Sequence, residues 1–242
     1  MLVLIGILAA IGRGIFTADL TTRVDPVRSG ILTSFGITDP FAPDRPALLQ
    51  YIDGRFAAHR LLTLLHILAG AMLLLLAPLQ FVTRGRGGYR RFHRWSGRAL
   101  MGAAIVAAVP AFYFGVIIPT AGPAEAVAIA TTTCFFLFAM GAAFTAIRRA
   151  DVPRHREWMI RAFAAALAIS TVRIVAVILD VALTPAGFRP LTIFVIAIWT
   201  GWIVTLGGAE VWIRSTRPRE AARKSANSSL AIVASCPNTS RF

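Results

Sequence analysis

Five long stretches of the chain carry almost no charge, and they constrain its fold more than any other feature. The stretches cover residues 61–83, 99–124, 126–147, 162–183 and 190–209. A run of about 18 apolar residues is long enough to cross the hydrocarbon core of a bilayer. Because backbone groups in lipid must satisfy their own hydrogen bonds, each run is expected to be a helix. The sequence therefore predicts an all-α, multi-pass transmembrane helical bundle.

The composition excludes several other classes of protein. Hydrophobic residues make up 57% of the 242 residues and charged residues only 15%, whereas soluble domains average about 45–50% and about 25%. A disordered chain, a coiled coil and an ordinary cytosolic domain are therefore excluded. The two cysteines, Cys134 and Cys236, do not form a disulfide framework.

The two ends of the chain and one long connection complete the predicted organisation. Residues 1–16 are apolar except for Arg13 and predict a short sixth span. Residues 17–58 predict a periplasmic loop, residues 59–213 a five-helix transmembrane core and residues 214–242 a disordered cytoplasmic tail. The predicted total is about six spans. Whether the first apolar segment crosses the membrane, or belongs to a start that lacks residues, is left open.

The positions of the basic residues predict an orientation. The net charge is +14, and three segments that would share one side of a six-span bundle hold 17 basic residues. The positive-inside rule places that side in the cytoplasm, so both termini are expected there, in a bacterial inner membrane. This distribution explains the excess charge without nucleic acid, which is not expected as a partner. The basic residues are Arg84, Arg86, Arg90, Arg91, Arg94 and Arg98, then Arg148, Arg149, Arg154, Arg156 and Arg161, then Arg214, Arg217, Arg219, Arg223, Lys224 and Arg241.

A weak internal repeat relates two of these basic segments. The eight residues 91–98 and the eight residues 154–161 each place a His-Arg pair at the entrance of an apolar run, with another arginine further on. The repeat suggests two helical hairpins related by a pseudo-twofold axis along the membrane normal.

The histidines of the repeat are the first candidates for chemistry. His93 and His155 would lie at the same membrane interface on neighbouring hairpins. Imidazole is a common axial ligand of haem iron, so the pair predicts haem b binding or quinone-linked electron transfer. The haem propionates would then contact Arg94, Arg98 and Arg161, whose guanidinium groups are typical partners of carboxylates. His66 is a further candidate ligand, although only one site with two histidines is expected.

Charged residues inside the apolar runs give an alternative. Arg173 and Asp180 interrupt the run 162–183, and His66 would reach a similar depth to Arg173. Placing an ionisable side chain in lipid is energetically unfavourable, so these residues indicate a polar site of a small-molecule or proton-coupled transporter. Arg173 and Asp180 could equally pair with each other, and His66 could simply link two helices.

A third alternative is a lipid-binding membrane protein without catalytic activity. The histidines of the repeat could be interfacial anchors, and the neighbouring arginines could hold the phosphates of membrane lipids. No Walker loop, dinucleotide-binding fingerprint or zinc-protease motif occurs in the sequence, so the question of an enzymatic activity stays open.

The combined motifs resemble a bacterial family of integral membrane proteins known as domain of unknown function 2306. The resemblance covers roughly residues 60–180 and is carried by His66 and Gly70, Pro78 and Gln80, the segment 93–98, the segment 155–161, and Thr171 and Arg173. Ala77 stands where the family usually has glycine, and Leu100 stands where it usually has tyrosine. The resemblance implies the membrane architecture and selects residues, but it names no reaction.

Overall fold

The described part of the chain is helical throughout. The computed structural model describes residue 34 and residues 45–83 and 87–235, and this part contains no strand. The predicted all-α class is therefore confirmed. The α-helices are α3 (Arg45–Ala58), α4 (Arg60–Thr83), α5 (Arg90–Phe112), α6 (Pro123–Arg148), α7 (Val152–Leu183) and α8 (Pro190–Ser235), with a short 3-10 turn η1 (Gly87–Tyr89) and a π turn η2 (Tyr113–Ile117).

Five helical segments are long and apolar enough to cross a membrane, as the sequence predicts. They are Arg60–Thr83, Gly87–Ile117, Pro123–Arg148, Val152–Leu183 and Pro190–Arg217. The shortest has 24 residues, which at about 1.5 Å per residue exceeds a hydrocarbon core of about 30 Å. The sixth span predicted at residues 1–16 lies outside the described residues.

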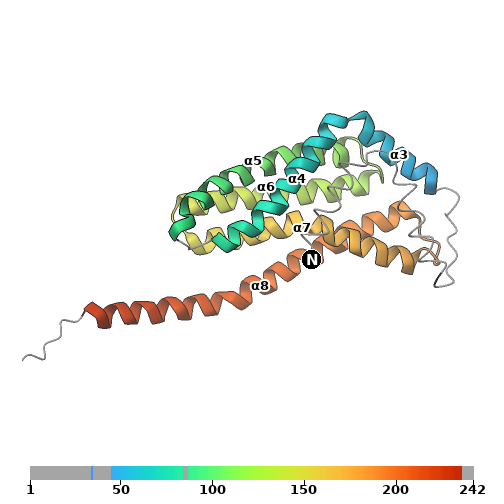
Figure 1. The fold of residues 1–242 in the computed structure, drawn as a ribbon. Helices are drawn as coiled ribbons and strands as arrows, with labels where there is room; N and C mark the ends of the chain where they lie inside the picture. The colour runs from blue at the N-terminus through green and yellow to red at the C-terminus, as the bar shows by residue number, and fades with distance from the viewer. Residues whose placement is uncertain (1–33, 35–44, 84–86, 236–242) are drawn as a thin grey trace, which may run out of the picture.

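Four of the spanning helices form a ring. α4 packs against α5, and α6 packs against α7, while narrower contacts between α5 and α6 and between α4 and α7 join the two pairs. α5 and α7 are therefore diagonal in the ring. α8 packs along α7 and then leaves the bundle at its C-terminal end (Figure 1).

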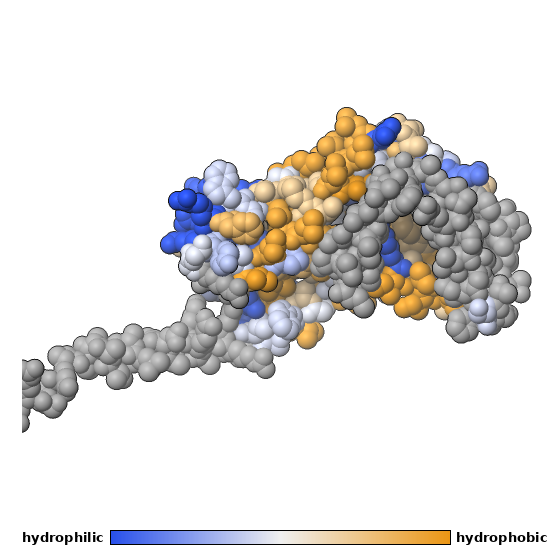
Figure 2. Space-filling view, viewed as in Figure 1, coloured by the Kyte–Doolittle hydropathy of each residue, from blue (hydrophilic) through white to orange (hydrophobic). Residues whose placement is uncertain are grey.

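The core of the ring is built largely from alanine. One buried cluster contains Ala69, Leu73 and Ala77 of α4, Leu100, Ala103, Ala104 and Ala107 of α5, Ala139 and Met140 of α6, and Ala162 of α7. Small side chains let helix backbones approach closely, which is how helices in lipid associate. Large apolar side chains such as Leu68, Ile105 and Phe138 are exposed instead, and orange atoms cover much of the bundle in Figure 2. This distribution is the one expected of a protein surrounded by lipid.

Two prolines lie inside spanning helices. Pro78 is in α4 and Pro110 is in α5. A proline removes one backbone donor from the helix, and three residues after Pro110 the chain changes to the π turn η2.

Parts of the predicted loop and of the predicted tail are helical in the structure. The last part of the predicted loop, residues 45–58, forms α3, and α8 continues past residue 214 to Ser235. The division of the chain into a loop, a core and a tail stays a prediction.

Candidate functional site

His93 and His155 occupy equivalent positions on diagonal helices. His93 is the fourth residue of α5, and His155 is the fourth residue of α7. Both helices begin at the same end of the ring, where the α4–α5 and α6–α7 turns lie (Figure 1). Because α5 and α7 each contact α4 and α6, the two histidines stand across the ring from each other at equal depth in their helices.

The Nδ1 atom of each of these histidines is bound to a neighbouring helix. His155 Nδ1 lies 2.8 Å from the carbonyl oxygen of Ala143 in α6. His93 Nδ1 lies 3.3 Å from Thr83 Oγ1 at the end of α4, and that hydroxyl donates its own proton to the Leu79 carbonyl. Both acceptors therefore require a proton on Nδ1, so in the neutral ring the lone pair is on Nε2.

Gln80 fixes the backbone beside His93. Its amide Nε2 donates to the His93 carbonyl at 3.3 Å and also to Ser96 Oγ. Gly97 lies beside this contact, where a Cβ would be 3.7 Å from Gln80 Oε1, an ordinary van der Waals distance. Gln80 and Ser96 are buried. The start of α5 is thus tied to α4 by two side chains, Gln80 and Thr83.

The three arginines predicted to bind an anion differ in their surroundings. Arg94 and Arg98 are exposed on α5, and the Arg98 guanidinium lies 5.2 Å from the centre of the Trp95 ring. Arg161 of α7 is instead bound by two carboxylates, those of Glu210 and Glu157. Its charge is already compensated within the protein.

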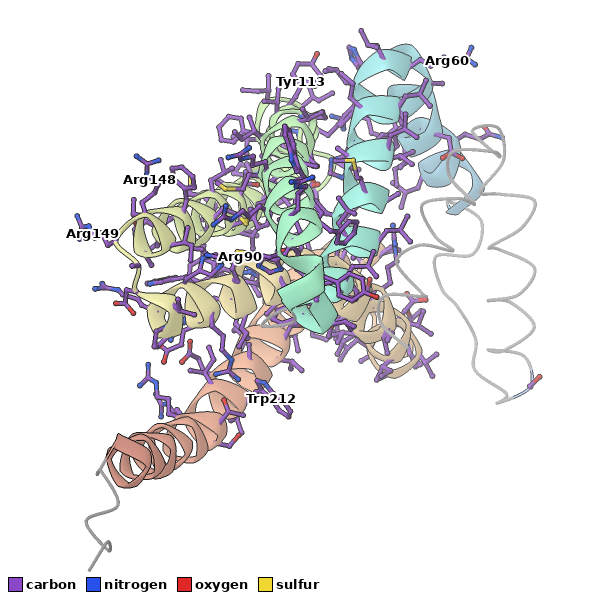
Figure 3. All side chains as sticks on the ribbon, turned by 60° about the vertical axis from the view of Figure 1, so that its left-hand side comes forward. Arg60, Arg90, Tyr113, Arg148, Arg149 and Trp212 are labelled. Carbon is purple, nitrogen blue, oxygen red and sulfur yellow. The ribbon has the colours of Figure 1, made fainter. Side chains whose placement is uncertain are left out.

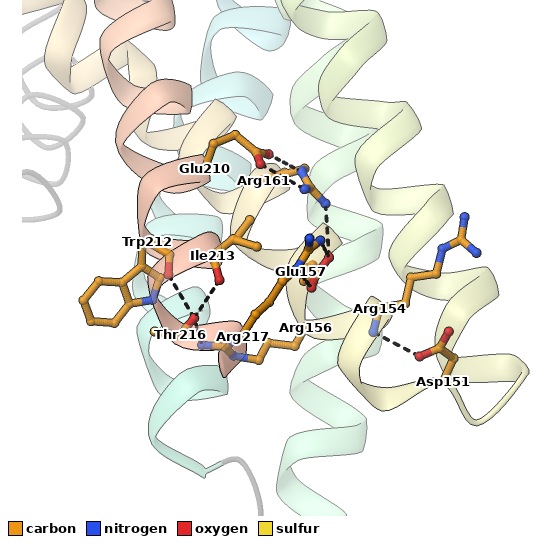
Figure 4. Close-up of polar contacts among 10 residues, drawn as sticks. All are labelled: Asp151, Arg154, Arg156, Glu157, Arg161, Glu210, Trp212, Ile213, Thr216 and Arg217. Carbon is orange, nitrogen blue, oxygen red and sulfur yellow. Dashed lines mark hydrogen bonds and ion pairs between the residues drawn. The ribbon is translucent and has the colours of Figure 1, made fainter. Parts of the chain in front are cut away.

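Arg161 belongs to an ionic cluster that joins α7 to α8 (Figure 4). Arg161 Nη2 donates to Glu210 Oε2 at 3.1 Å, and its Nε also donates to that carboxylate. Arg217 of α8 donates to both oxygens of Glu157. The side chains of Arg161 and Glu157 are only 15% and 16% exposed, so the cluster is partly buried. Glu210 was not identified from the sequence. The feature that could have pointed to it is its position as a lone acidic residue directly after an apolar run.

Hydrogen bonds to backbone and hydroxyl groups surround this cluster. Arg156 donates to Thr216 Oγ1 at 3.0 Å, and Asp151 accepts from the backbone N–H of Arg154 at 3.1 Å. The second contact caps the N-terminus of α7. The acidic residues of this region are therefore used to hold the α6–α7 turn and α8 in place.

The polar residues predicted within the spans lie on α4 and α7, which contact each other. His66 Nδ1 lies 2.9 Å from the Ala107 carbonyl oxygen of α5. His66 and Arg173 are both exposed. Asp180 accepts a hydrogen bond from Thr184 Oγ1 at 3.1 Å. Within the predicted group, His66 thus joins α4 to α5, and Asp180 contacts the end of its own helix.

His59 and Tyr113 lie at the opposite end of the ring from His93 and His155. His59 Nε2 is 3.5 Å from Tyr113 Oη, and the two rings meet edge to face. Figure 3 shows Tyr113 and Arg60 at this end, away from Arg148 and Arg149.

Comparison with known proteins agrees with the membrane architecture. No curated protein and no solved structure matches the chain. A family model with the description "Predicted membrane protein (DUF2306)" matches residues 63–213, which is more than half of the chain and includes all the histidines discussed above except His59. The chain therefore belongs to this family of membrane proteins, as the resemblance of its motifs indicates.

Proposed function

We propose that the protein binds one haem b between His93 and His155 and takes part in electron transfer within the membrane. The observation that carries this proposal is the matched position of the two histidines, each the fourth residue of its helix, on diagonal helices at one end of the ring. Two imidazoles from different helices are a common way to hold haem iron. A membrane quinone is the kind of small redox partner that such a site would serve.

The hydrogen bonds of the two rings support this proposal. Metal-ligating histidines usually donate their other ring N–H to a carbonyl or similar acceptor, which fixes the tautomer and the ring orientation. His155 donates to Ala143 and His93 donates to Thr83. Each neutral ring then carries its lone pair on Nε2, the atom that would bind the iron.

The same four helices also supply apolar side chains. Leu100, Ala139 and Met140 belong to the buried apolar cluster of the ring, and apolar side chains of this kind would exclude water from a bound cofactor. Bound haem supplies a carrier of one electron, while the histidines hold the iron and the apolar side chains keep the site dry. The predicted propionate contacts of Arg94 and Arg98 stay predictions, and Arg161 is the weakest candidate because of its carboxylate partners.

The test is an absorption difference spectrum of membranes from an overexpressing strain grown with sufficient haem. Dithionite-reduced membranes are expected to give a b-type signal in proportion to the protein, and both His93→Gln and His155→Gln should lose it. His59→Gln is the matched control, because His59 lies at the opposite end and contacts Tyr113. Absence of the signal in the wild-type protein, or an unchanged signal in both variants, would contradict the proposal.

A second candidate function is recognition of a small organic anion within the membrane. The observation that favours it is that His66 of α4 and Arg173 of α7 are exposed ionisable residues inside two spanning helices that contact each other. Ionisable side chains inside spans commonly mark substrate pathways. Arg173 and His66 would offer a guanidinium and an imidazole to one carboxylate, as a transporter or a binding protein would require.

This second function is tested by thermal unfolding of the purified protein with benzoate as the probe. Benzoate is expected to raise the unfolding temperature of the wild-type protein and to have no effect on Arg173→Gln. Arg189→Gln is the control, because Arg189 lies outside the spanning helices. Equal shifts in all three proteins would show that benzoate acts elsewhere.

A further inference from the structure

A cleft at the start of α5 is lined almost entirely by cationic side chains. Its volume is about 550 Å³, and its walls are Arg90, Arg91, Arg94, Arg98 and Trp95, with Gly87 and Gly88 at one edge. The cleft lies on the end of the bundle where Figure 2 shows hydrophilic atoms gathered beside the apolar surface. It is thus a concentrated positive surface at the end of a helix that can cross a membrane.

No carboxylate in the described part of the chain forms an ion pair with these four arginines. The first turn of α5 contains no acidic residue. The Arg98 guanidinium instead lies over the Trp95 ring. The cluster of α7 and α8 is the opposite case, because Arg161 and Arg217 there are held by Glu210 and Glu157.

The spacing of the arginines makes this arrangement unfavourable without an anion. Arg90, Arg94 and Arg98 recur every four residues and therefore lie on one face of α5, where like charges repel. Arg90 also occupies the first turn of the helix, at the positive end of its dipole. A local conflict of charge that the fold does not relieve is typical of a binding surface.

Trp95 and the position of the cleft identify the kind of anion. The Trp95 side chain is 63% exposed, and exposed tryptophans at the ends of spanning helices lie at the level of lipid headgroups. We propose that the cleft binds the phosphate of an anionic phospholipid headgroup. The guanidinium groups bind the phosphate oxygens in pairs, and the indole ring packs beside the headgroup. This proposal concerns the exposed face of α5 and does not depend on haem.

The experiment counts phospholipids bound to the full-length protein in detergent by native mass spectrometry. Phosphatidylglycerol is the anionic probe and phosphatidylcholine, which has no net charge, is the comparison. The wild-type protein is expected to bind the first phosphatidylglycerol about tenfold more tightly than the first phosphatidylcholine. Arg94→Gln combined with Arg98→Gln should remove this preference.

The matched control removes two other arginines from the same end of the bundle. Arg148 ends α6 and Arg149 follows it, and both are exposed (Figure 3) and do not line the cleft. The control carries Arg148→Gln and Arg149→Gln, and it should keep the preference because its net charge changes equally but its cleft does not. Loss of the preference in both double variants, or in neither, would overturn the proposal.

A second variant tests the same cleft without removing any arginine. A Cβ on Gly88 would meet no atom within 4 Å, so Gly88→Glu can place a carboxylate in the cleft. We expect Gly88→Glu to lose the preference for phosphatidylglycerol and to keep its thermal stability, because the acid lies near the start of α5. Gly88→Gln is the uncharged control and should bind like the wild type. Equal binding by Gly88→Glu and Gly88→Gln would contradict a phosphate site here.

Discussion

Gly201 of α8 lies directly against the backbone of Val172 in α7. A Cβ on Gly201 would be 2.8 Å from Val172 Cα and 2.8 Å from its backbone nitrogen. Contact this close needs a residue without a side chain. It brings α7 and α8 together at a point that precedes Glu210 of the ionic cluster along α8. Val172 is itself buried in a second apolar cluster with Ala128, Ala197 and Ile198.

Gly201→Ala is therefore expected to destabilise the protein, although alanine normally favours a helix. Forcing a methyl group into a filled contact costs about 1–3 kcal/mol. Gly208→Ala in the same helix is the control, because a Cβ there meets no atom within 4 Å. That variant should gain about 0.5–1 kcal/mol. Unfolding in mixed micelles measures both, and a change of the same sign in the two variants would contradict the close approach.

Glu210→Gln is expected to loosen α8 from α7. The substitution removes the carboxylate that binds Arg161 Nε and Nη2, while Glu157 remains 3.9 Å from that guanidinium. Because Glu210 is 38% exposed, solvent screens part of the interaction and the loss is about 1 kcal/mol. Arg161→Gln should cost at least as much, since it leaves two carboxylates without this partner.

The measurement for this cluster is a double-mutant cycle of Glu210→Gln and Arg161→Gln, followed by thermal unfolding. If the two residues interact as described, the combined loss will be smaller than the sum of the single losses. Additive losses would indicate that the side chains act independently.

Thr83→Val is expected to weaken haem binding if His93 is an iron ligand. Thr83 Oγ1 accepts the Nδ1 proton of His93, and valine has a similar shape but no acceptor. Loss of such a partner typically lowers metal affinity about 10–100-fold. Thr131→Val is the control, because Thr131 Oγ1 contacts only its own helix at the Val127 carbonyl. Haem titration of the purified variants gives their haem affinities. Equal affinities of Thr83→Val and Thr131→Val would show that Thr83 does not support haem binding.

The spanning helices could be predicted from the sequence because hydropathy acts locally. A run of apolar residues long enough for a bilayer needs no knowledge of its neighbours, and the stretch 61–83 lies within α4 (Arg60–Thr83). The repeated His-Arg pairs also predicted that His93 and His155 lie at one end, since helices joined by short turns alternate in direction. The chemistry of haem ligation does not follow from that position and remains a proposal.

The contacts between helices could not be read from the sequence. Glu210 and Arg161 are 49 residues apart, and their pairing depends on how α8 lies along α7. Arg161, Arg94 and Arg98 look alike in the repeat. Packing nevertheless gives Arg161 two carboxylate partners, whereas Arg94 and Arg98 line an open cleft. Gly201 carried no signal either, because nothing in its neighbourhood reveals that it faces Val172.

The most direct measurement of the central proposal is a titration of the purified protein with haem, followed by absorption and electron paramagnetic resonance spectroscopy. Ligation by His93 and His155 predicts saturation at one haem per chain and the low-spin signature of iron with two histidine ligands. His155→Gln should then give a high-spin signal or weaker binding, whereas His59→Gln should behave like the wild type. Binding that does not saturate, or a low-spin signal that persists in both His93→Gln and His155→Gln, would contradict the proposed site.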